Sequence, residues 1–134
     1  LSAPRMGEVL VDEGLIPDVA ICSTARRASD TLELLQTTCP IDGPITHTRE
    51  IYHGSMDTYL SYLSRLPENA QTAILVGHNP DMDHAVMVLS GSYENMVTAA
   101  IAAIQFEIDY WKAILEEPKG RLIGYWKPRD FLTF

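Results

Sequence analysis

The sequence is short of cysteine, of long apolar runs and of export signals. Its two cysteines, Cys22 and Cys39, lie far apart, and neither belongs to a CxxC pair. A disulfide framework or a structural zinc site is therefore not expected, and the cysteine usage favours a reducing, cytoplasmic setting. No apolar run reaches the length of a membrane span, and no basic segment leads into an apolar one before a cleavage site. We therefore expect neither a membrane partner nor export.

Positive charge is also scarce. The chain has 10 Lys and Arg residues against 18 Asp and Glu residues, which gives a formal net charge of -8. A protein that binds a nucleic-acid backbone needs clustered Lys and Arg to neutralise phosphates, so nucleic acid is not the expected partner. Any anion that this chain binds must meet a local positive site.

What the chain does contain is the composition of one globular domain over residues 1–134, with 46 % apolar and 21 % charged residues. Residues 4–13 have the apolar spacing of a helix, and Gly14 follows as a stop signal. No strand comes before this helix, although an α/β domain seldom opens with a helix. We therefore expect that residues 1–134 lack the first strand of their domain.

The stretch 72–81 organises the rest of the chain. Its apolar run has the length of a strand buried on both faces and ends abruptly at Gly77 and His78. We expect Asn79 to cap the next helix and Pro80 to take its first position. His78 would then lie at the carboxyl edge of a central strand, beside backbone N–H groups that can bind an anion. The alternative is a histidine that only forms a hydrogen bond within the turn.

A second strand-to-helix transition follows the apolar run at 19–22, where we expect Ser23 and Thr24 to cap a helix. The first turn of this helix carries Arg26 and Arg27, which face the positive end of the helix dipole. Arginines in that place make sense if an anion is bound between guanidinium and backbone N–H groups. Alternatively, both side chains point into water or pair with carboxylates one turn later.

The order of the remaining elements predicts the fold class. We expect a strand at 45–48, a helix opened by Ser55, a helix at 81–89, a strand at 97–108 and a final antiparallel strand at 121–126. This order predicts an α/β fold, a three-layer α/β/α sandwich whose central sheet is mostly parallel with an antiparallel edge. Such sheets bind ligands at the carboxyl ends of their strands, so we expect Arg27 and His78 at one edge.

Three segments resemble the histidine phosphatase superfamily. Residues 23–31 (STARRASDT) resemble its S-x-x-x-R-A-x-x-T segment, and residues 76–80 (VGHNP) resemble its second-histidine motif. The tail at 120–132 is similar to the close of the small phosphohistidine phosphatase (SixA-like) branch. The resemblance implies a phosphoglycerate mutase-like fold and a phosphatase without metal or cofactor.

The resemblance also implies roles for single residues. Arg27, and not Arg26, would bind phosphoryl oxygens, His78 would be the second histidine of the pocket, and Asn79 would help to shape the turn. Glu50 follows a predicted strand, where it could serve as the acid that protonates a leaving group. The other interpretation of Glu50 is a solvated glutamate in a loop.

The family nucleophile is a histidine in an R-H-G segment on the first strand, and residues 1–134 contain no such segment. We therefore expect the nucleophile upstream, on the missing strand. Only 50 residues separate Arg27 from His78, which leaves no room for a large lid. The open site predicts a phosphorylated protein, with phosphohistidine as the side chain, or else a small phosphorylated substrate.

Three other interpretations compete with this one. A cysteine-dependent phosphatase needs C-x5-R, but counting from Cys22 places Ala28 at the arginine position. A metal site made of the four histidines has no pair at the i, i+4 spacing of a metal-binding helix; they are His47, His53, His78 and His84. The main rival is a non-catalytic, phosphate-binding regulatory module that keeps Arg27 and His78 without a nucleophile.

Overall fold

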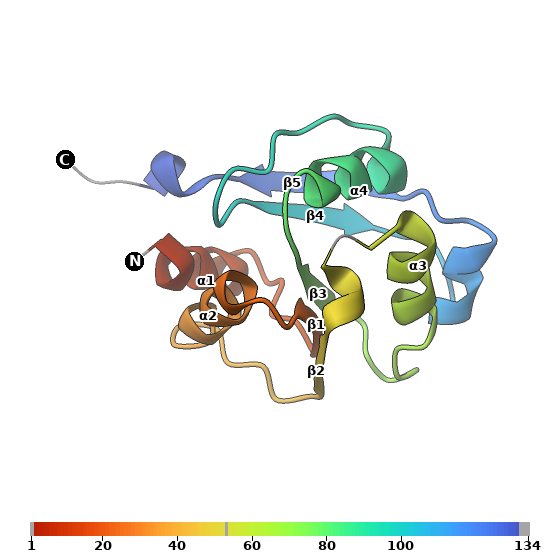
Figure 1. The fold of residues 1–134 in the computed structure, drawn as a ribbon, viewed down its shortest axis with the longest axis horizontal. Helices are drawn as coiled ribbons and strands as arrows, with labels where there is room; N and C mark the ends of the chain where they lie inside the picture. The colour runs from red at the N-terminus through yellow and green to blue at the C-terminus, as the bar shows by residue number, and fades with distance from the viewer. Residues whose placement is uncertain (1, 53, 132–134) are drawn as a thin grey trace.

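Helices and strands follow one another nearly as the sequence pattern predicts (Figure 1). The computed structural model describes residues 2–52 and 54–131. Its elements are α1 (Ser2–Asp12), β1 (Val19–Ser23), α2 (Arg26–Leu35), β2 (Ile45–Thr48), the 3-10 helix η1 (Arg49–Ile51), α3 (Met56–Ser64), β3 (Ala73–Val76), α4 (Asp81–Ser90), β4 (Ile101–Gln105), η2 (Trp111–Leu115), β5 (Arg121–Trp126) and η3 (Pro128–Phe131). No helix in these two ranges is long and apolar enough to cross a bilayer.

Strand β1 is the centre of a parallel ladder in the order β2-β1-β3. It pairs with β2 through 20–23 and with β3 through 19–22. All five residues of β1 are buried, as expected for an apolar run that is covered on both faces. Strand β2 lies at the edge of the ladder, which confirms the predicted strand at 45–48.

Strands β4 and β5 form a second, antiparallel ladder. The predicted strand at 97–108 was too long, because β4 covers only Ile101–Gln105. Ahead of β4 the N–H of Ala100 donates to the Val97 carbonyl, and Ala99 has a φ of 63°, a left-handed conformation that strands do not use. Strands β3 and β4 do not pair, so the strands of the described residues form two ladders.

Alternate residues of β1 face opposite helical layers, as the strand period requires. Ile21 packs with Tyr59 of α3 and Ala85 of α4, whereas Ala20 and Cys22 pack against α2. Figure 1 shows α1 and α2 together on one side of the parallel ladder and α3 on the other. The predicted α/β/α sandwich, with parallel strands and an antiparallel edge, is confirmed.

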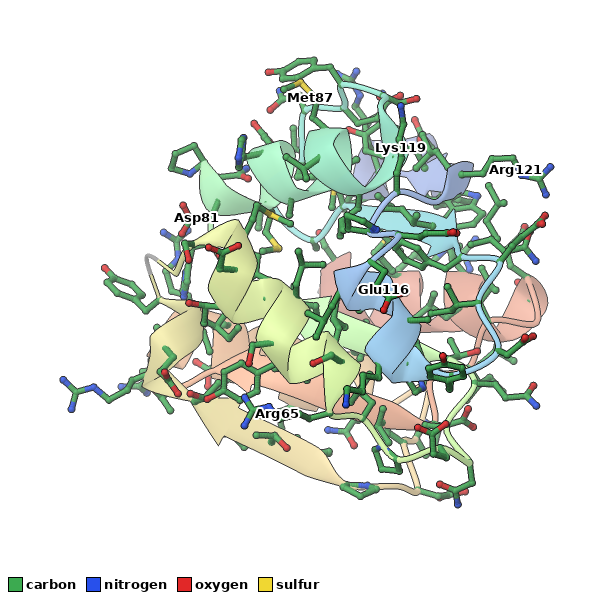
Figure 2. The ribbon with its side chains drawn as sticks, turned by 90° about the vertical axis from the view of Figure 1, so that its right-hand side faces the viewer. Arg65, Asp81, Met87, Glu116, Lys119 and Arg121 are labelled. Atoms are coloured by element: carbon green, nitrogen blue, oxygen red, sulfur yellow. The ribbon has the colours of Figure 1, made fainter. Side chains whose placement is uncertain are left out.

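Two helix ends agree with their sequence signals. The Ser55 hydroxyl accepts a hydrogen bond from the Thr58 N–H (3.3 Å) and caps α3, as predicted. Helix α4 ends at Gly91 with a φ of 76°, where glycine avoids the strain of a left-handed residue. Lys119 lies beside this end of α4, where its positive charge complements the helix dipole (Figure 2).

Candidate functional site

The carboxyl end of β1 delivers Ser23 to the start of α2. Ser23 is buried, and its hydroxyl accepts a hydrogen bond from the N–H of Ala25 (3.1 Å). Helix α2 itself begins at Arg26, and its N-cap is Ala25, without a side-chain cap. The predicted capping by Ser23 and Thr24 was therefore wrong, because Ser23 holds the residue before the helix rather than the N–H groups of the helix.

The first turn of α2 is built to attract an anion. It contains no acidic residue, and among the hydrogen bonds of the described residues none uses the N–H groups of 26–28. Arg26 lies 3.6 Å from Asp30, with 93 % of its side chain exposed. Arg27 forms no ion pair with a described residue. Free N–H groups and an unpaired guanidinium together offer several donors to one set of oxyanion oxygens.

The carboxyl end of β3 delivers His78 to the same place. Its Nε2 atom lies 2.8 Å from the Ser23 hydroxyl oxygen, within hydrogen-bond distance. The ring of Tyr52, from the segment after η1, meets the His78 ring edge to face, with centroids 4.8 Å apart. His78 is thus fixed by a buried hydroxyl from β1 and an aromatic ring from beyond β2.

The start of α4 differs from the predicted cap. Pro80 is the N-cap, the helix begins at Asp81, and no side chain caps it. The Asn79 side-chain amide instead donates to the Met96 carbonyl, and the Met96 N–H donates to Asp83 (2.6 Å). Asn79 and Asp83 therefore hold the loop between α4 and β4 by binding the backbone carbonyl and the backbone N–H of Met96.

Helix α4 is also a poorer place for an anion than α2. Asp81 and Asp83 both lie in its first turn. Figure 2 shows Asp81 where the start of α4 meets α3, and burial together with the nearby Asp81 charge raises the pKa of Tyr59. Because these carboxylates already lie at the positive end of the α4 dipole, an anion is expected to bind more strongly at the start of α2 than at the start of α4.

One cavity of about 1160 Å³ connects the predicted residues. Arg27, His78 and Asn79 all line it, and so does Tyr52. Glu50 is not among the lining residues; its carboxylate accepts a hydrogen bond from Tyr62, whose hydroxyl also lies 2.8 Å from that of Thr48. Three of the four predicted residues thus line one cavity. The role of Glu50 stays a prediction, and its carboxylate is bound by Tyr62.

The structure gives little support to a cysteine nucleophile or to a metal site. Cys22 is buried, and burial raises its pKa to about 11, whereas a nucleophilic cysteine needs a lowered pKa. Among residues 2–52 and 54–131 no three His, Cys, Asp or Glu side chains come close enough to hold a metal ion. His53, one of the four histidines weighed for such a site, lies outside the described residues.

The sequence did not reveal the pairing of Ser23 with His78 or the contact of Tyr52 with His78. Ser23 carries a weak signal, because it opens the S-x-x-x-R-A segment, but its partner lies 55 residues away. Tyr52 carries no local signal at all, since a tyrosine in a loop is ordinary. Contacts between distant elements leave no periodic trace in a sequence.

We expect Ser23→Ala to destabilise the fold by about 1–3 kcal/mol, because the substitution leaves the Ala25 N–H without its acceptor and His78 without its hydroxyl partner. Oxyanion affinity should fall as well, since His78 then loses one of the contacts that orient its ring. Urea unfolding and calorimetric titration with tungstate measure the two effects. Thr24→Ala is the matched control, because this neighbouring hydroxyl is exposed; an equal loss in both variants would contradict the role given to Ser23.

No protein-family model matches the chain. It is similar to uncharacterized protein ML1117 of Mycobacterium leprae (29 % identical over 86 residues, 64 % of this chain), of which the match spans 51 %, about half its length. Uncharacterized protein Rv1276c of Mycobacterium tuberculosis is 29 % identical over 123 residues, which are 84 % of this chain and 74 % of that protein.

Solved structures are similar over almost the whole chain. A protein assigned as phosphohistidine phosphatase SixA from Agrobacterium tumefaciens superposes with a TM-score of 0.76 at 24 % identity, covering 95 % of this chain and 78 % of that one. The protein histidine phosphatase SixA complexed with tungstate gives a TM-score of 0.81 at 20 % identity, covering 97 % and 81 %. The fold is that of SixA. The phosphoglycerate mutase-like architecture expected from the resemblance is thereby confirmed.

Proposed function

We propose that the chain is the larger part of a phosphatase that hydrolyses a phosphorylated substrate, with protein phosphohistidine as the preferred one. The observation that carries this proposal is that Arg27, in the helix after β1, and His78, after the neighbouring parallel strand β3, line one cavity beside the N–H groups at the start of α2. Such a group of donors suits the equatorial oxygens of a phosphoryl group in transfer. The similarity to SixA structures supports the same reaction class.

The reaction proceeds through a phosphohistidine on the enzyme. An imidazole nitrogen of the nucleophile attacks phosphorus in line, the bond from phosphorus to the substrate breaks, and the leaving group takes up a proton. Water then attacks the phosphoenzyme, which releases orthophosphate and restores the histidine. Arg27 and His78 stabilise the charge on the oxygens in both steps. The nucleophile belongs to a segment outside residues 1–134.

The position of Glu50 supports phosphohistidine over an alkyl phosphate as substrate. We assign Glu50 as the acid for those substrates that need one, yet it lies outside the cavity lining and accepts a hydrogen bond from Tyr62. An alkoxide is a poor leaving group and depends on a well-placed acid. The imidazole of phosphohistidine leaves more readily, so a site with a remote acid still acts on it.

Substrate competition tests this assignment. We expect the complete protein to hydrolyse a phosphohistidine peptide at least about tenfold faster than the matching phosphoserine peptide, a difference of about 1.4 kcal/mol in the barrier. Glu50→Gln should lower only the phosphoserine rate, because only that leaving group needs the acid. Hydrolysis of phosphoserine at an equal or higher rate would reject the preferred substrate, and hydrolysis of neither would reject the phosphatase.

A further inference from the structure

Arginines gather at one edge of a chain that is acidic as a whole. Arg26 and Arg27 lie in the first turn of α2, after β1, and Arg49 is the first residue of η1, after β2. The last residues of these two parallel strands, Ser23 and Thr48, are register partners. Adjacent strands lie about 4.8 Å apart, so the three arginines start from the same edge of the ladder. They are three of the 10 Lys and Arg residues in a chain with a net charge of -8.

The segment that carries Arg49 is held against the oxyanion site. The carbonyl of Arg49 accepts a hydrogen bond from the N–H of Tyr52 (3.0 Å), and the Tyr52 ring contacts the His78 ring. Between them Ile51 is fully buried, and a Cβ on Gly77 would lie 3.4 Å from its side chain. Arg49 does not line the cavity itself. Its backbone is therefore fixed next to the oxyanion site, on the outer side of it.

The arginine side chains at this edge reach into solvent. Arg26, Arg27 and Arg49 are all exposed. Arg49, like Arg27, forms no ion pair with a described residue, and the contact of Arg26 with Asp30 is a weak, exposed one at 3.6 Å. The neighbouring carboxylate of Glu50 is bound by a tyrosine of α3. Two guanidinium groups beyond Arg27 are thus available to carboxylates of another molecule.

The opposite side of the cavity carries the opposite charge. Asp81 and Asp83 lie in the first turn of α4, and Met82 between them lines the cavity. A peptide that crosses the cavity therefore meets positive charge on the side of α2 and η1 and negative charge on the side of α4. Complementary charge of this kind speeds association and fixes the direction in which a peptide binds.

We infer that Arg26 and Arg49 form a docking surface for acidic residues that flank the phosphorylated side chain of a protein substrate on one side. The inference rests on the proposed function, because it takes the oxyanion site as the place of the phosphoryl group. Arg27 binds that group, and the two other arginines bind carboxylates a few residues away along the substrate. A chain with a net charge of -8 repels acidic segments over most of its surface, so such a segment is expected to bind at this edge.

Binding of phosphonate peptides to the complete protein tests the docking surface without turnover. The probes carry a non-hydrolysable phosphonate at the centre and three glutamates, lysines or alanines on either its N-terminal or its C-terminal side. We expect glutamates on one of the two sides to raise the affinity about three- to tenfold over alanines. This gain should vanish in about 1 M salt, where the Debye length falls to about 3 Å. Glutamates without effect on either side, or with the same effect on both, would overturn the inference.

Charge reversal assigns the gain to the two arginines. Arg49→Glu should abolish most of the gain and make lysines the preferred residues on that side, whereas Arg26→Gln should remove only part of it. Lys112→Glu is the matched control, because it makes the same charge change at an exposed residue of η2. Trp111 of η2 donates to the carbonyl of Ala70, ahead of β3, which places η2 at the opposite edge of the ladder. An equal loss in Lys112→Glu would overturn the inference, because net charge alone would then explain the gain.

Tungstate separates a local effect from damage to the fold. The free ion has no flanking residues, so Arg49→Glu should change its affinity by less than about twofold. The described contacts of Arg49 use its backbone alone, so its side chain can be replaced without loss of a partner. Should Arg49→Glu weaken tungstate binding more than this, Arg49→Gln takes its place, and a glutamate gain that persists in it would overturn the inference.

The outcomes for the docking surface and for the phosphatase are distinct. A protein that hydrolyses no phosphohistidine but prefers glutamate-flanked phosphonates through Arg49 has the docking surface without the proposed function. A protein that hydrolyses phosphohistidine peptides and ignores their flanks has the function without the docking surface. A single-stranded oligonucleotide that displaces the peptides through Arg49 would assign these arginines to nucleic acid and overturn the inference.

Discussion

Arg27→Lys is expected to weaken tungstate or phosphate binding by about 10- to 100-fold, whereas Arg26→Lys should change it by less than about twofold. The two residues are neighbours in the first turn of α2 and differ in their partners. Arg26 is mostly exposed and lies within ion-pair distance of Asp30. Both arginines are exposed and both line the cavity, but Arg27 has no carboxylate partner among the described residues.

The size of the effect follows from the geometry of the guanidinium group. Arginine can give two parallel hydrogen bonds to two oxyanion oxygens, and lysine can provide only a point charge. Charge-assisted hydrogen bonds contribute about 1.5–3 kcal/mol each, so the loss of one accounts for the expected range. Arg26→Lys is a matched control because it makes the same chemical change one residue away and keeps the net charge.

Isothermal titration with tungstate measures both variants, and a crystal soaked with tungstate locates the ion. Density between the first turn of α2 and His78 is the expected result. Equal losses in the two variants would mean that Arg26 shares the site, and an ion found at the start of α4 would show that the acidic first turn there does not repel it.

The fold class could be predicted because it depends on local periodicity. The apolar runs at 19–22 and 73–76 have the length of strands, and the amphipathic segments between them have the period of helices. Their alternation predicts parallel strands covered by helices. The ends of elements were less predictable: residues 97–100 are apolar like β4, but they form a turn in which Ala99 is left-handed. Composition alone does not distinguish a strand from an apolar turn.

The site could be predicted in part, for a different physical reason. Arg27 and His78 follow strands of one parallel ladder, so topology alone brings them to one edge. What the sequence could not reveal was the chemistry between elements. Ser23 is a helix-cap residue by local pattern, yet its hydroxyl faces His78. Asn79 is a cap residue by the same rule, yet its amide holds Met96. Ser23 adds a tertiary partner to its local hydrogen bond with the Ala25 N–H, and Asn79 uses a tertiary partner in place of a local one.

The largest expected effect is on turnover. Residues 1–134 alone should hydrolyse no phosphohistidine or phosphate ester above background, and the protein with its upstream segment should do so. In the proposed mechanism Arg27 and His78 would still stabilise charge, but the nucleophile proposed to accept the phosphoryl group lies outside residues 1–134. The other described histidines cannot replace the nucleophile, because His47 lies on the edge strand β2 and His84 on α4, and neither lines the cavity.

A burst assay with a phosphorylated peptide decides among the outcomes, with acid-labile phosphate on the protein as the readout. In the extended protein we expect one phosphate per chain to form and then turn over, and replacing the histidine of its R-H-G segment by alanine should abolish both. Phosphate trapped by residues 1–134 on His78 would make His78 a nucleophile rather than a stabiliser. An extended protein without an R-H-G segment that binds tungstate at Arg27 but stays inactive would be a phosphate-binding regulatory module, because the donors for the oxyanion remain when the acceptor of the phosphoryl group is absent.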